Sequence, residues 1–185
     1  MKTYLAVGLS LTLLAGAVVA AGTIKSGPQV GEELAGPFHP LNINGAKAGE
    51  KNCLYCENGN NPVIMIFARE PNETVTKLIQ KVDEVTAKNK DARMGSFVVF
   101  CSSDKGLEKE LTTLAKKLDL KKCVLAIDNP AGPDKYEVAR DADVTVVLYV
   151  KSTVKANHAF KKGELKDKNI DTILADVSKI LPEKK

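Results

Sequence analysis

The stretch VIMIF at residues 63–67 decides the fold, because it is an unbroken apolar run. A run of this kind and length is typical of a β-strand that is buried on both faces, as in the centre of a parallel sheet. Directly after it, Asn72-Glu73-Thr74 suits the start of a helix, and apolar residues then recur at helical spacing over residues 75–85. The sequence therefore predicts a buried strand followed by an amphipathic helix.

The same alternation continues along the chain. Further strands are predicted at residues 97–100, 124–127 and 144–150, with an antiparallel return at 154–160. Helices are predicted at residues 107–118, 136–140 and 170–181. Strand–helix alternation followed by a hairpin and a closing helix predicts an α/β fold, in which a mixed central sheet carries helices on both faces.

The N-terminus differs in kind from the rest of the 185 residues. Met1-Lys2 supplies a positive start, residues 5–19 are apolar, and small residues follow at 18–21. This pattern is typical of a signal peptide, although an uncleaved membrane anchor is the alternative reading. We expect residues 1–21 to be a signal peptide, 22–61 an extended lead-in with a short strand near 38–43, and 62–182 the folded domain.

Export would place the mature protein in the periplasm or outside the cell, where disulfides can persist. No stretch of the mature chain is expected to hold it in a membrane once the leader is removed. The net charge of +4 is spread along the chain, and no basic block is interleaved with aromatic residues. Nucleic acid is therefore not an expected partner.

The order of elements resembles the thioredoxin-like superfamily, and within it the peroxiredoxin-like branch of alkyl hydroperoxide reductases and thiol-specific antioxidant proteins. The segment Asp128-Asn129-Pro130, followed by YEVA at residues 136–139, is similar to that branch's D-P…E-V-A pattern. The resemblance covers residues 62–181 and implies a thioredoxin-like three-layer fold.

The chain departs from those families where their chemistry resides. Thioredoxins carry W-C-x-x-C after the first central strand, and peroxiredoxins carry P-x-x-x-T-x-x-C there. Here residues 68–76 read AREPNETVT and contain no cysteine, and Val144 stands where the family has its cis-proline. Thioredoxin or peroxidase chemistry at the usual position is therefore not expected.

The sharpest local signal is the CxxC motif Cys53-Leu54-Tyr55-Cys56, which precedes the first central strand instead of following it. Because the two ends of parallel strands lie at opposite poles of a sheet, we expect the pair to lie away from the usual active site. Three interpretations remain open: a structural disulfide, a disulfide that cycles, or a metal site with Cys123 as a further ligand.

We take Cys53 and Cys56 as the candidate catalytic residues of an exported thiol–disulfide oxidoreductase whose partner is an unknown protein thiol or disulfide. No cofactor or metal is assigned. The alternative is a catalytically silent thioredoxin-fold binding or scaffold module, in which the disulfide is structural.

The other candidate residues have simpler explanations. Cys101 and Cys123 fall at opposite ends of neighbouring strands and should not pair with each other. His158 is expected to be a satisfied or solvent-facing imidazole, and Arg69 and Glu70 are expected to form a surface pair.

Overall fold

The apolar run at residues 63–67 forms the centre of a sheet in the computed structural model, which describes residues 24–183. The predicted signal peptide, residues 1–21, lies outside the described residues. The strands are β1 (Leu41–Asn42), β2 (Val63–Ala68), β3 (Gly95–Cys101), β4 (Cys123–Asp128), β5 (Val144–Val150) and β6 (Thr153–Phe160). The helices are α1 (Leu54–Asn58), α2 (Glu73–Lys88), α3 (Leu107–Lys117) and α4 (Asp167–Ala175), with 3-10 turns at Lys90–Ala92 and Asp176–Lys179.

The strands form one mixed sheet in the order β1-β4-β3-β2-β5-β6. β2, β3 and β4 run parallel, whereas β5 runs antiparallel to β2, and β6 to β5. Val63, the first residue of β2, lies opposite Gly95 of β3 and Tyr149 of β5. The amino ends of the parallel strands and the β5–β6 turn therefore lie at the same pole of the sheet.

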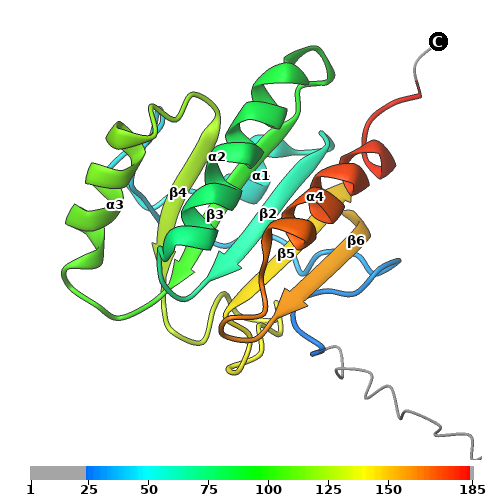
Figure 1. Cartoon of the computed structure of the whole chain (residues 1–185). Helices are drawn as coiled ribbons and strands as arrows, with labels where there is room; N and C mark the ends of the chain where they lie inside the picture. The colour runs from blue at the N-terminus through cyan, green and yellow to red at the C-terminus, as the bar shows by residue number, and fades with distance from the viewer. Residues whose placement is uncertain (1–23, 184–185) are drawn as a thin grey trace, which may run out of the picture.

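One face of the sheet is covered by α2, α3 and α4, which lie together in front of it (Figure 1). Alternate residues of the central strands, such as Ile64 and Ile66, pack there against Leu78, Leu111 and Ile173. All five side chains are fully buried. This layer is the larger of the two hydrophobic clusters.

The opposite face is covered mainly by the lead-in. Phe67 and Phe97 point to this face and meet Leu34, Phe38 and Leu54, which come from residues before β2. The only regular helix on this side within residues 24–183 is the short α1, which lies behind the sheet in Figure 1. Helices on both faces are thus confirmed, but most of the second layer is irregular chain.

The lead-in also pairs with the sheet through its backbone. It supplies β1, which runs antiparallel to β4, with Leu41 opposite Ile127. At the other side of the sheet, Glu33 forms a bridge with Thr153, and the Gly31 N–H donates to the Val154 carbonyl at 3.0 Å. The lead-in therefore contacts both outermost parts of the sheet.

The helix predicted at residues 136–140 is wrong. Lys135 and Glu137 have φ values of 66° and 51°, which no right-handed helix contains. The Tyr136 ring is buried against Phe38, with ring centroids 4.9 Å apart, and its hydroxyl donates to the Gly36 carbonyl at 2.6 Å. The ring is therefore buried under the lead-in from a loop and not from a helix.

Asp83 fastens α2 to the start of β4. Its side chain is buried, and its carboxylate accepts hydrogen bonds from the backbone N–H groups of Lys121, Lys122 and Cys123 at 2.7–3.2 Å. A buried carboxylate requires such donors to offset the loss of hydration.

His158 on β6 is satisfied by Asp176, with 2.9 Å between Nε2 and Oδ2, which confirms the expectation for this imidazole. Partial burial raises the pKa of Asp176, but hydrogen bonds from Lys179 and His158 outweigh it and hold the pKa below its usual value.

Among residues 24–183, no helix has the length and apolar character needed to cross a membrane.

Candidate functional site

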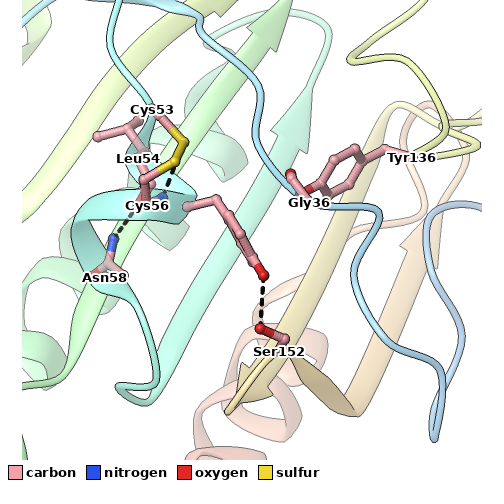
Figure 2. Close-up of a disulfide and its surroundings, with 8 residues drawn as sticks. Gly36, Cys53, Leu54, Cys56, Asn58, Tyr136 and Ser152 are labelled. Carbon is pink, nitrogen blue, oxygen red and sulfur yellow. Dashed lines mark hydrogen bonds between the residues drawn. A yellow bond between two sulfur atoms is a disulfide. The ribbon is translucent and has the colours of Figure 1, made fainter.

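Cys53 and Cys56 form a disulfide at the start of α1, with their Cα atoms 5.2 Å apart (Figure 2). Cys53 is the residue that precedes the helix, and its sulfur accepts a hydrogen bond from the Cys56 N–H at 3.1 Å. The CxxC spacing thus places one sulfur just before the first turn and the other within it. Of the interpretations left open by the sequence, the geometry is that of a disulfide.

Helix α1 is not predicted from the sequence, because five residues are too few for a periodic pattern. Within it, the Asn58 side-chain amide donates to the Leu54 carbonyl at 2.7 Å. Gly59 ends the helix with φ 49°, and its N–H donates to the Tyr55 carbonyl at 3.1 Å. A glycine directly after Asn58 is a helix-stop signal that the sequence does carry.

Residues within the CxxC motif anchor it to the sheet. Leu54 is 1% exposed and lies in the same cluster as Val63 and Phe67. The Tyr55 hydroxyl forms a 2.8 Å hydrogen bond with Ser152 Oγ in the β5–β6 turn, as the dashed line in Figure 2 shows. The two residues between the cysteines therefore hold the disulfide against the sheet.

The motif lies at the pole formed by the amino ends of the parallel strands. Asn58 abuts Gly95, the first residue of β3, and the Lys151 N–H donates to the Asn60 carbonyl at 3.3 Å. Arg69 and Val144 lie at the opposite ends of β2 and β5, at the pole where the parallel strands end. The expected displacement of the pair from the usual active site is confirmed.

Replacing Gly95 with Ala should lower the free energy of unfolding by about 1–3 kcal/mol, the usual cost of overpacking. A Cβ at this position would overlap the Asn58 side-chain oxygen. Urea unfolding of the Gly95→Ala variant measures the loss. The same substitution in an Asn58→Ala background should cost less, whereas equal costs in the two backgrounds would contradict the packing of α1 against β3.

The two cysteines of the pair differ in exposure. Cys56 is exposed, whereas Cys53 is only 6% exposed and lies beside the buried Leu54. A thiol reagent from solvent thus meets the Cys56 side of the bond first. The pair is accessible, but from one side.

Cys123 is not brought to the pair, so the three-cysteine metal site is not formed. Its side chain is 1% exposed and packs in the cluster with α2, α3 and α4, on the opposite face of the sheet from α1. Among the residues that the structure describes, no group of three or more His, Cys, Asp or Glu side chains could hold a metal ion.

Cys101 and Cys123 are unpaired thiols within residues 24–183, as the opposite ends of their strands led us to expect. Burial raises the pKa of the Cys101 thiol to about 12, although the Arg69 charge acts in the opposite direction. Burial likewise raises the pKa of Cys123 to about 12. Since the thiolate is the reactive form, neither thiol is suited to exchange at neutral pH.

The pole where thioredoxins carry their cysteines is held together by Arg69. Its guanidinium donates to the backbone carbonyls of Pro130, Ala139 and Ala142 and thereby fixes the loop that follows β4. The predicted pairing of Arg69 with Glu70 is wrong, because the loop carbonyls satisfy the guanidinium.

Glu70 instead pairs with Lys162 at 3.0 Å. Burial and the Glu70 carboxylate raise the pKa of the nearby Asp143, against the opposing charges of Lys162 and Arg69. This pole thus carries charged side chains and the buried Cys101, but no exposed thiol among the described residues.

No protein-family model and no curated protein sequence matches the chain. Solved structures do match. A candidate protein disulfide isomerase from Bacteroides thetaiotaomicron is 15% identical with a TM-score of 0.64, covering 86% of this chain and 96% of the other. Peroxidoxin BcpB from Mycobacterium tuberculosis is 14% identical with a TM-score of 0.58, covering 86% and 99%.

The exposed lipoprotein thioredoxin Etrx1 of Streptococcus pneumoniae is 17% identical with a TM-score of 0.54, covering 77% of this chain and 98% of the other. These likenesses extend over most of both chains, and the matched proteins include both thioredoxin and peroxiredoxin types. The fold of this chain is thioredoxin-like, as the order of its elements predicts.

Proposed function

We propose that this thioredoxin-like chain exchanges disulfides with a protein thiol partner through Cys53 and Cys56. The observation that carries the proposal is a surface disulfide in a short CxxC ring, with Cys56 exposed. Exchange requires that a partner thiolate reach one sulfur of the bond, and Cys56 is the residue of the pair that faces solvent.

The two other cysteines of the chain are poorly suited to disulfide exchange, which supports the assignment to Cys53 and Cys56. Cys101 and Cys123 are buried, and the pKa of each is raised by burial, so little thiolate forms at neutral pH. Thiol chemistry in this chain therefore falls to the pair on α1. The similarity in fold to a thioredoxin and to a candidate disulfide isomerase agrees with such chemistry.

The reduction potential of the Cys53–Cys56 couple tests the proposal. We expect a value above about −300 mV, because exposed disulfides are more readily reduced than structural ones. The protein is equilibrated in thiol–disulfide buffers of graded potential, and its free thiols are alkylated and counted by mass spectrometry. The Cys53→Ser/Cys56→Ser variant is the matched control and should show no change in thiol count.

A second candidate function is a binding or scaffold module whose disulfide is structural. The buried Leu54 and Cys53 favour it, because they fix the ring to the sheet. A potential below about −300 mV would favour this function over exchange. In that case the double serine variant would keep its partner binding but would be less stable. Its loss in free energy of unfolding should be below the roughly 2–4 kcal/mol typical of longer disulfide loops.

We further propose that the mature chain works outside the cytoplasm. The predicted signal peptide at residues 1–21 supports this proposal, and so does the similarity in fold to an exposed lipoprotein thioredoxin. In an oxidising compartment the Cys53–Cys56 disulfide can also persist until a partner thiol reaches it.

A further inference from the structure

The two ends of the disulfide are chemically unequal, and this difference gives the exchange reaction a direction. We infer that the partner thiolate attacks the Cys56 sulfur and that Cys53 is the leaving group, an inference that rests on the function proposed above. The attack would thus fall on the second cysteine of the motif.

Access favours attack on the Cys56 sulfur. In thiol–disulfide exchange the rate depends on which sulfur the thiolate can reach. Cys56 is exposed on α1, whereas Cys53 is 6% exposed and is followed by Leu54, which is buried against the sheet. A protein partner that approaches α1 from solvent therefore reaches Cys56, and the support beneath Cys53 excludes it from the other sulfur.

The Cys53 sulfur is also the better stabilised leaving group. The Cys56 backbone N–H already donates to the Cys53 sulfur at 3.1 Å (Figure 2). When the S–S bond breaks and Cys53 receives the electron pair, this hydrogen bond becomes a charge-assisted one, which is stronger. Within residues 24–183 no N–H or O–H group donates in this way to the Cys56 sulfur, so the opposite polarity lacks this stabilisation.

The exchange with a partner dithiol then balances in two steps. First, a partner thiolate bonds to the Cys56 sulfur while the Cys53–Cys56 bond breaks, and Cys53 leaves as a thiolate. Next, the second partner thiolate attacks the partner sulfur of this mixed disulfide, and Cys56 leaves as a thiolate. Two electrons pass from the partner dithiol to the pair, the partner becomes a disulfide, and the new thiolates take protons from water.

Trapping the intermediate in the unaltered protein tests this direction. The oxidised chain is mixed with reduced glutathione, quenched early with iodoacetamide, and digested for peptide mass mapping. We expect glutathione on Cys56 and the alkyl group on Cys53 in at least about tenfold excess over the reverse arrangement, since access and leaving-group quality both favour it. Equal amounts, or an excess of glutathione on Cys53, would overturn the inference.

Single variants give a matched second measurement. Cys53→Ser leaves the exposed Cys56, and Cys56→Ser leaves Cys53 in its buried position. With oxidised glutathione, Cys53→Ser should form its adduct roughly tenfold faster than Cys56→Ser, because burial limits access to Cys53 even though the Cys56 N–H favours its thiolate, and the reverse order would contradict the inference. The reduction potential of the unaltered protein separates the two proposals. If the bond is readily reduced but glutathione is found on Cys53, only the inference that Cys56 is attacked is wrong. If the bond resists reduction, the proposed exchange function itself is wrong.

Discussion

Replacing Phe38 with Ala is expected to lower the free energy of unfolding by about 3–5 kcal/mol, the usual cost of truncating a buried aromatic side chain. Phe38 belongs to the lead-in, yet its ring centroid lies 6.4 Å from those of Phe67 and Phe97 and 4.9 Å from that of Tyr136. Removing the ring would leave a cavity between the lead-in, the sheet and the loop after β4. Urea unfolding followed by circular dichroism measures the loss.

Val30→Ala is the matched control for Phe38→Ala, because it truncates an apolar side chain of the same segment that is 63% exposed. Its effect should stay within about 0.5 kcal/mol. If Phe38→Ala cost no more than this control, the lead-in would not be part of the folded core.

Replacing Asp83 with Ala should lower the free energy of unfolding by about 3 kcal/mol, because hydrogen bonds to a charged group contribute more than neutral ones. The carboxylate accepts from three consecutive backbone N–H groups, at Lys121, Lys122 and Cys123. Cys123 is buried, so water cannot replace the lost acceptor there. Chemical unfolding gives the change in stability, and hydrogen exchange of the Cys123 amide reports the local loosening.

Asp83→Asn keeps one oxygen acceptor and should lose only part of this stability. Asp91→Ala removes an exposed carboxylate just beyond α2 and should change the free energy of unfolding by no more than about 0.5 kcal/mol. Similar losses for Asp83→Ala and Asp91→Ala would mean that Asp83 does not fasten α2 to β4.

The central layers of the fold could be predicted because local patterns of apolar residues indicate which side chains are buried. The run at residues 63–67 has both faces apolar, and in β2 its alternate residues do face the two clusters. Asn72 accepts from the Val75 N–H at 3.0 Å at the start of α2, as the helix-start pattern indicated. Periodicity of this kind can be recognised from neighbouring residues alone, without knowledge of the contacts between distant parts of the chain.

The second layer could not be predicted, because long-range contacts decide it. Tyr136 follows a loop conformation set by Phe38 and Gly36, about a hundred residues earlier in the chain. Arg69 finds its acceptors in the loop after β4 and not in the adjacent Glu70. The position of the CxxC pair at the amino pole followed from topology, but the unequal exposure of its two cysteines depends on how α1 packs and is visible only in three dimensions.

The contact of the lead-in with both sides of the sheet has a consequence for solubility. Unpaired strand borders are templates on which another chain can add a strand, and this is a common route to aggregation. Here β1 caps the border of β4, and residues 31–34 cap the start of β6. If the segment before Cys53 were removed, both borders would be uncovered, and we expect such a truncated chain to self-associate more readily than the intact one.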